Sequence, residues 1–252
     1  MPRSRIGFDA AFFAALERLC DLLLARAGDS FPGQGMPGGL AALLAGLFPE
    51  GGRPRSLPAG LLERVLAETR QALAPWLDRR WSTATGLLNL AGAGLYNRAA
   101  REAFHATELR VVIVPERLVV PAAGPCRASR NSLGRSCRGC TLGCPARVAA
   151  EVCRGHETLQ VLAGDAGELL ATWTGAAFAA GGIGVVLAAR VPELITTGHR
   201  ALAAGVPALC LPLDGGRAGA DESVNPEALA ALLAPAPFVR QAVARQAVAV
   251  PA

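Results

Sequence analysis

The chain has 252 residues, of which 52% are hydrophobic and 18% are charged. This composition excludes a disordered or fibrous protein, and the length allows one large domain or two small ones. All 25 basic residues are arginine, and a net charge of +5 is too small for a chain of this length to indicate nucleic-acid binding unless the arginines cluster.

The first hundred residues predict helices. Apolar side chains recur with a helical period in four segments, Phe8 to Ala27, Leu40 to Phe48, Ala59 to Leu73 and Trp81 to Phe104. No cluster of titratable side chains stands out in the sequence of this part. We therefore predict a helical N-terminal region, residues 1–105, that carries no candidate site.

The pattern changes at Leu109, where short apolar strands begin to alternate with helices. Strands are predicted near residues 110–114, 158–162, 183–188 and 206–211. Helices are predicted near residues 145–153, 167–178 and 192–204. This alternation predicts the α/β fold class, with residues 106–252 as a small parallel, Rossmann-like domain whose ligands bind at the carboxyl ends of the strands.

Two features of the sequence bear on location. The longest uncharged run, Leu169 to Ala189, is long enough to cross a bilayer, but its glycines divide it into a helix-like and a strand-like half, so we expect a buried core segment. Charged residues interrupt the apolar stretch near the N-terminus that an export signal would need. We expect a cytoplasmic protein away from the membrane, with reduced thiols that more often bind metal than form disulfides.

Three cysteines follow one another closely in the segment Cys137-Arg-Gly-Cys140-Thr-Leu-Gly-Cys144-Pro. Thiolates at this spacing, in a glycine-bearing loop that runs into a helix, can converge on one metal centre. Cys126 is the favoured fourth ligand because a short loop closes easily, and Cys210 on a later strand is the alternative. The spacing therefore predicts a metal site, with reduced thiols that bind no metal as the competing interpretation.

The kind of metal stays open at this point. The spacing C-x2-C-x3-C-P equals the last three cysteines and the proline of the bacterial ferredoxin motif, whose first cysteine would fall at Gly134. Zinc sites use the same C-x2-C step. Both zinc and an iron–sulfur cluster are therefore expected candidates.

The cysteine segment is also rich in arginine, and no acidic residue lies between Glu116 and Glu151. The arginines considered as an anion site or as support for the metal are Arg127, Arg135, Arg138 and Arg147. Guanidinium groups would offset the negative charge of a metal–thiolate centre, or they would hold a small anionic ligand such as phosphate. A solvated loop whose arginines reflect codon bias is the third interpretation.

Other classes of function find little support in the sequence. The histidines are scattered, a second C-x2-C pair is missing, and aromatic residues make up only 5% of the chain, so a nucleic-acid partner is not expected. The alternative to a metal-site protein is an α/β enzyme that acts on a small anionic metabolite. A pocket lined by Arg117, Asp214 and Asn225 would favour that enzyme.

Several motifs carry a resemblance to a known family. They are Ile113-Val-Pro-Glu-Arg-Leu118, the cysteine segment from Ser136 to Cys144, Ile183-Gly-Val-Val-Leu187, Gly205-Val-Pro-Ala-Leu-Cys-Leu-Pro-Leu-Asp214, and Asn225 before a last helix. From about Leu109 to Leu232 the chain resembles the domain of unknown function 116 family, whose members are uncharacterised cysteine-bearing α/β proteins. The resemblance implies the architecture and a metal centre rather than a reaction.

The chain departs from that family at three places. Members commonly carry cysteines where this chain has Arg117-Leu118, Leu187 and Gly215-Gly216-Arg217. What this chain keeps is the cysteine segment with Cys126 and Cys210. We predict an accessory or regulatory metal-site protein whose partner is another protein or a small anionic ligand.

Overall fold

The computed structural model describes most of the chain in separate stretches. These are residues 8–30, 60–77, 82–119, 126–131, 133–140, 142, 144–154, 159–173, 182–203, 205–215 and 222–234. The helix predicted from Leu40 to Phe48 lies outside the described residues.

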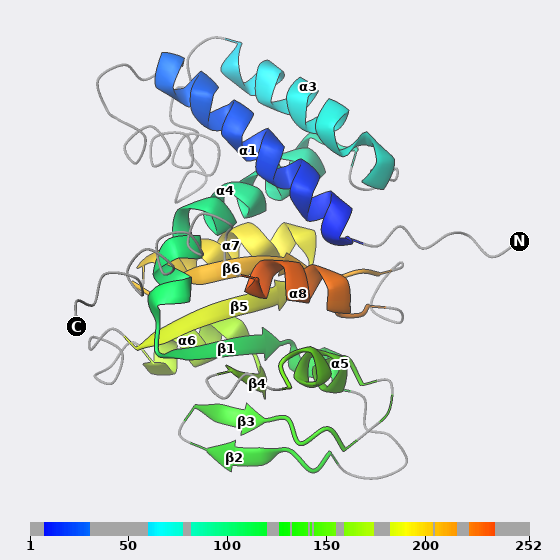
Figure 1. Ribbon diagram of the computed structural model, residues 1–252, viewed down its shortest axis with the longest axis vertical. Coiled ribbons are helices and arrows are strands. Elements are labelled where there is room, and N and C mark those ends of the chain that lie inside the picture. Colours follow the sequence, from blue (N-terminus) through cyan, green and yellow to red (C-terminus); the bar gives the residue numbers. More distant parts are fainter. Residues whose placement is uncertain are drawn as a thin grey trace, which may run out of the picture.

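A six-stranded sheet forms the centre of the molecule, in the order β2-β3-β4-β1-β5-β6 (Figure 1). The strands are β1 (Leu109–Val114), β2 (Ser129–Asn131), β3 (Gly134–Ser136), β4 (Leu159–Ala163), β5 (Ile183–Ala189) and β6 (Ala208–Pro212). The four apolar strands β4, β1, β5 and β6 run parallel, whereas β2 and β3 form an antiparallel hairpin that joins β4 in antiparallel orientation. The α/β class predicted from the sequence is confirmed.

Helices cover both faces of the parallel strands. The helices α5 (Pro145–Val152) and α8 (Pro226–Leu233) lie over one face, and α6 (Ala166–Trp173) and α7 (Val191–Ala203) lie behind it in Figure 1. Strands β1 and β5 are buried on both faces, which explains why they are continuous runs of valine, isoleucine and leucine rather than alternating patterns. Two hydrophobic clusters result from this arrangement, and the larger one continues around β6 to residues of α7.

The N-terminal part is helical, as predicted, with α1 (Ala10–Ser30), α3 (Leu61–Leu73) and α4 (Ala84–Ala106). The boundary predicted near residue 105 falls at the C-terminal end of α4, but one hydrophobic cluster continues across it. The backbone N–H of Phe8 also donates to the Asp214 carboxylate beyond β6, at 2.7 Å. The N-terminal helices and the sheet therefore share a core.

Asn97 joins α4 to the edge strand β6. Its side-chain amide donates to the carbonyl of Cys210 at 2.9 Å and its side-chain oxygen accepts the N–H of the same residue. Asn97 is almost fully buried, and the two hydrogen bonds satisfy strand groups that no neighbouring strand could reach. This one side chain thus satisfies the outward-facing backbone groups of Cys210 on the edge strand.

The segment between β1 and α5 differs from the prediction of a continuous loop. It contains β2 and β3, three residues each, and their sequences are polar and rich in arginine. Strands this short and polar have no apolar alternation that sequence analysis could detect. The other strands begin and end within two residues of their predicted positions, and the helix predicted over 167–178 is described up to Trp173 as α6.

The described helices include none that is both long and apolar enough to cross a membrane.

We expect Asn97→Ala to lower the free energy of unfolding by about 3 kcal/mol, because it leaves the buried N–H and C=O of Cys210 without partners. Urea denaturation followed by circular dichroism measures the change. Asn89→Ala is the matched control, since among the described residues the Asn89 amide bonds only to the Thr85 carbonyl within the same helix. It should cost less than about 1 kcal/mol. Equal losses in the two variants would contradict the role of Asn97 at the sheet edge.

Candidate functional site

Four cysteines line one small cavity at the outer part of the sheet. The residues around it are Val119, Cys126, Ala128, Cys137, Cys140, Cys144, Ala146, Arg147 and Ala163. The thiols come from three segments, one before β2, one after β3 and one at the start of α5. The structure therefore brings together the four cysteines that sequence analysis grouped.

Backbone pairing places Cys137 at this cavity. Strand β3 pairs with β4 so that Arg135 lies opposite Ala163, and the N–H of Cys137 continues the ladder by donating to the Val161 carbonyl at 2.8 Å. Side chains two residues apart in a strand share a face, so Cys137 and Ala163 lie on the same side of the sheet. That side is the one covered by α5.

Helix α5 brings in Cys144. This residue is the N-cap of the helix, and Pro145 occupies the first helical position. The lack of an N–H in proline costs nothing there, because the first N–H groups of a helix have no partner within the helix. Ala146 and Ala149 face the core, and their small side chains let the helix approach β1 and β4 closely. The helix start thus meets the cysteine segment that follows β3.

The turn between Cys137 and Cys140 is held by backbone and side-chain bonds. Gly139 has a φ of 64°, a left-handed conformation that glycine adopts without strain. Its N–H donates to the Cys137 sulfur at 3.3 Å, and its carbonyl accepts from the Arg147 guanidinium at 3.1 Å. The N–H of Arg127 donates to the Cys140 sulfur at 3.4 Å. Two of the four sulfurs are therefore already hydrogen-bond acceptors.

The four thiols differ in exposure. Cys144 is buried, Cys126 and Cys137 are half-buried and Cys140 is exposed. Burial raises the pKa of Cys137, the N–H of Gly139 lowers it, and negative charge on Cys144, Cys140 and Cys126 would raise it further. The four sulfurs thus lie within electrostatic reach of one another, and a cation between them would relieve their repulsion.

The donor set fits a zinc ion or an iron–sulfur cluster. Both take four thiolate ligands, and N–H donors to sulfur are the supporting contacts that such centres use. As the side chains stand, the described residues contain no group of three or more His, Cys, Asp or Glu in position to hold a metal ion. Binding of a metal ion by these four thiols would therefore require their sulfurs to come closer together.

The remaining three cysteines, Cys20, Cys153 and Cys210, do not line this cavity. Burial raises the pKa of Cys20, Cys153 and Cys210 to about 12. Cys210, the alternative fourth ligand, is fully buried on β6 with its sulfur 3.9 Å from the Leu194 carbonyl, and it does not line the cavity. Cys126 does line it and is the fourth thiol there.

The four arginines predicted around the site fall into two pairs. Arg135 forms an ion pair with Glu116, and Arg147, which lines the cavity, pairs with Glu151 at 2.8 Å. Arg127 and Arg138 are exposed, and Arg138 donates to the Ser129 hydroxyl at 2.9 Å. The two acidic residues that bracket the segment in sequence are therefore the partners of two of its arginines.

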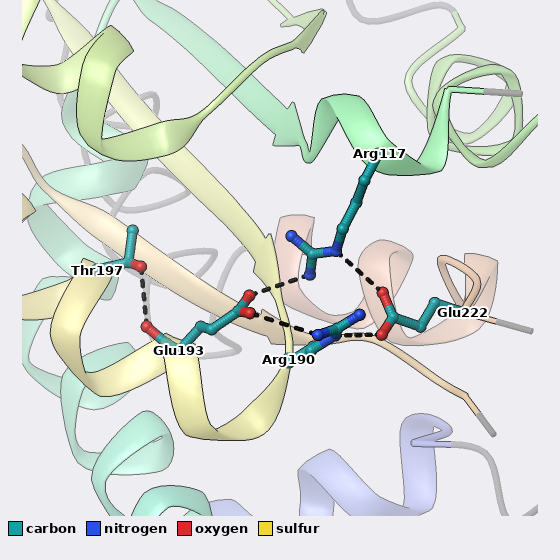
Figure 2. A network of polar contacts seen from close by, with 5 residues as sticks. All are labelled: Arg117, Arg190, Glu193, Thr197 and Glu222. Carbon is teal, nitrogen blue, oxygen red and sulfur yellow. Dashed lines mark hydrogen bonds and ion pairs between the residues drawn. The ribbon is translucent and has the colours of Figure 1, made fainter. Parts of the chain in front are cut away.

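A second polar cluster lies at the carboxyl ends of the inner strands (Figure 2). Arg117 contacts Glu193 at 3.0 Å and Glu222 at 3.3 Å, and Arg190 contacts the same two carboxylates. The Glu222 side chain is only 7% exposed, so two guanidinium groups compensate its buried charge. Sequence analysis missed Arg190, Glu193 and Glu222. The sequence marks them only by position: Arg190 and Glu193 follow β5, and Glu222 lies beside Ser223, which pairs with Asp214 after β6.

Three residues, Arg117, Asp214 and Asn225, would have favoured an enzyme if they lined a pocket. Each of them forms hydrogen bonds or ion pairs with other parts of the chain instead. Arg117 belongs to the ion-pair cluster of Figure 2. Asp214 accepts the amide of Asn225 at 3.1 Å, and the Asn225 oxygen caps the start of α8. Burial raises the pKa of Asp214, and the hydrogen bonds from the Phe8 N–H and the Asn225 amide lower it. These groups hold the segments after β1 and β6 in place.

Comparison of the chain with family models, with curated proteins and with solved structures finds no match. The resemblance to the domain of unknown function 116 family stays a prediction from its motifs.

We predict that iodoacetamide labels Cys140 first in the folded, metal-free protein, then Cys126 and Cys137, and leaves Cys20, Cys153 and Cys210 unmodified. Only the thiolate reacts, and a pKa of about 12 leaves almost none of it at neutral pH. Peptide mass spectrometry after timed labelling measures the order, and labelling in urea gives the full count. Early labelling of Cys20, Cys153 or Cys210 in the folded protein would contradict this description.

Proposed function

We propose that the chain is a metal-binding protein, in which Cys126, Cys137, Cys140 and Cys144 hold one zinc ion or one iron–sulfur cluster, and that it serves an accessory or regulatory role. The observation that carries the proposal is the shared cavity of these four thiols. The other three cysteines are buried apart from it. A structural zinc ion and an iron–sulfur cluster are both commonly bound by four cysteine sulfurs at one place.

The protein groups around the cavity have defined roles in this proposal. The N–H groups of Gly139 and Arg127 stabilise negative charge on the Cys137 and Cys140 sulfurs. Arg147 fixes the turn by bonding the Gly139 carbonyl and keeps its own charge paired with Glu151. When bound, zinc would supply a structural cross-link between hairpin and helix, and an iron–sulfur cluster would supply one-electron chemistry.

The enzyme alternative has less support. The residues that would have lined an anion pocket, Arg117, Asp214 and Asn225, are engaged with Glu193, Glu222 and the backbone of Phe8. The reactive side chains that the structure gathers at one cavity are thiols. The action of an α/β enzyme on a small anionic metabolite therefore stays a prediction from sequence, and the metal site is the function that we favour.

The test is anaerobic purification of the full chain with elemental analysis and an absorption spectrum. We expect either a brown protein containing iron and sulfide or a colourless protein with one zinc per chain. Serine substitution of Cys126, Cys137, Cys140 or Cys144 should each abolish or strongly reduce metal content. Cys153→Ala is the control, because Cys153 is buried at the far end of α5 and does not line the cavity.

Two results would overturn the proposal. One is a folded protein that acquires neither metal, even after anaerobic reconstitution with zinc or with iron and sulfide. The other is full metal content in all four serine variants.

A second test compares two glycines. Gly139 and Gly205 both have positive φ, at 64° and 69°, and apart from their chain neighbours no described residue has an atom closer than 4.0 Å to the position of an added Cβ. Alanine at either position should cost about 1–2 kcal/mol of stability, because both require the left-handed conformation. Only Gly139→Ala should weaken metal binding, by roughly tenfold or more, because it disturbs the turn that aims an N–H at Cys137. Competition with a chromophoric chelator measures the affinity, and equal weakening in both variants would show that the loss follows stability alone.

A further inference from the structure

Two arginines follow the two central strands of the sheet. Arg190 comes directly after β5, and Arg117 lies in the short turn after β1. Strands β1 and β5 are parallel neighbours, so both arginines lie at the same carboxyl edge. Their guanidinium groups contact the same two carboxylates, those of Glu193 and Glu222 (Figure 2). The fold therefore places a pair of cations at the centre of this edge.

The connections of β1 and β5 leave the edge in opposite directions. The chain after β1 reaches its next parallel strand at β4, and the chain after β5 reaches β6 on the other side of the pair. Helix α5 of the first connection and helix α7 of the second lie on opposite faces of the sheet (Figure 1). Neighbouring parallel strands whose connections diverge in this way mark the place where open α/β sheets bind ligands. Arg117 and Arg190 flank that place.

The Glu222 carboxylate lies between the two arginines. Its Oε2 accepts from Arg117 Nε at 3.3 Å and its Oε1 accepts from Arg190 Nε, so each oxygen faces a different guanidinium. A phosphate or carboxylate group of a ligand presents pairs of oxygens to arginine in the same way. The Glu222 side chain is nearly buried, whereas both arginine side chains are 39% exposed. Glu222 is therefore an internal anion held by cations that solvent still reaches.

Three of the four contacts in this cluster are long. A strong charge-assisted bond between nitrogen and oxygen measures about 2.8 Å. Arg117 lies 3.0 Å from Glu193 and 3.3 Å from Glu222, and Arg190 lies 4.0 Å from Glu193. A carboxylate that leaves a buried position regains its hydration, and an incoming anion takes over its two guanidinium partners. Exchange of Glu222 for an external anion therefore leaves no charge buried and unpaired.

The segment that carries Glu222 is also anchored without the help of its carboxylate. The next residue, Ser223, forms an antiparallel bridge with Asp214, in which the two N–H groups donate to the opposite carbonyls at 2.8 and 3.0 Å. The Asn225 side chain bonds the Asp214 carboxylate and caps α8. The Glu222 side chain can therefore leave the arginines while the backbone beside it stays in place.

We propose that Arg117 and Arg190 form a binding site for a small molecule that carries a phosphate or carboxylate group, and that the Glu222 carboxylate occupies this site when no ligand is bound. The oxyanion of the ligand replaces Glu222 between the two guanidinium groups. The inference assigns binding and no reaction. It goes beyond the metal site, because neither arginine belongs to the described lining of the cysteine cavity.

The experiment titrates the full chain with inorganic phosphate and, separately, with succinate at low ionic strength, and follows the arginine Nε–H signals by heteronuclear NMR. Glu222→Gln is the test variant, since glutamine keeps the size of the side chain and removes its charge. Glu17→Gln is the matched control. Glu17 also contacts two arginines, Arg98 at 3.5 Å and Arg101 at 2.9 Å, but it does so between α1 and α4. Both substitutions change the net charge equally.

We expect Glu222→Gln to bind phosphate or succinate at least about tenfold more tightly than the wild-type chain, with signal shifts at Arg117 and Arg190. An internal competitor lowers the apparent affinity by the fraction of sites that it leaves free, and the substitution removes that competitor. Glu17→Gln should bind no more tightly than wild type, and adding Arg190→Gln to Glu222→Gln should reverse the gain. The tighter of the two probes identifies which oxyanion class the site takes.

Three outcomes are incompatible with the inference: no binding of either probe to folded Glu222→Gln, equal gains in Glu222→Gln and Glu17→Gln, or a gain that survives Arg190→Gln. Circular dichroism establishes that each variant is folded. If Glu222→Gln does not fold, Glu193→Gln replaces it, because Glu193 is more exposed and contacts both arginines. It should also tighten binding, and an unchanged affinity would then contradict the site. Metal content measured in the same samples tests the cysteine cavity separately, because each result can fail while the other holds.

Discussion

The candidate site depends on the attachment of one short hairpin to the outer parallel strand. The N–H of Cys137 donates to the Val161 carbonyl, which extends the pairing of β3 with β4 by one residue into the cysteine segment. That bond fixes which face Cys137 presents, since a shift of one residue would turn its side chain to the other side of the sheet. Helix α5 covers the same face of the sheet, so Cys137 lies near Cys144 at the start of the helix. The cavity forms between the residues that follow β3 and the N-terminus of α5.

The carboxyl edge of the sheet is divided between two kinds of polar chemistry. Around the ends of β5 and β6, the ion pairs of Figure 2 hold Arg117, Arg190 and Glu222 together. Around the end of β4, thiols and small apolar side chains line the cavity. The boundary between these regions lies at two adjacent residues after β1. Glu116 pairs with Arg135 of the hairpin, whereas Arg117 pairs with Glu222 in the ion-pair cluster. Parallel sheets usually bind ligands along this edge, and here charge compensation within the chain takes up its inner half.

Sequence analysis was effective where burial determines the residue type. The four parallel strands are apolar because both of their faces are covered, so their positions could be predicted. The hairpin could not, because its strands have three polar residues each and depend on pairing with β4. The grouping of the cysteines, with Cys126 favoured over Cys210, followed from local spacing, and the fold places Cys126 at the cavity and Cys210 on β6 away from it. The ion pairs of Arg117 join residues 76 and 105 positions apart, and no local pattern carries that information.

The arrangement of charge around the cavity follows from the cost of burying ions. Arg135 and Arg147 are half-buried and each has a carboxylate partner, which compensates a guanidinium that is only partly exposed to water. Arg127, Arg130 and Arg138 reach water, where an unpaired guanidinium costs little. Four thiolates on one zinc ion or cluster would add net negative charge to a place where the half-buried arginines are already neutralised. The surrounding positive charge would then come from the exposed arginines.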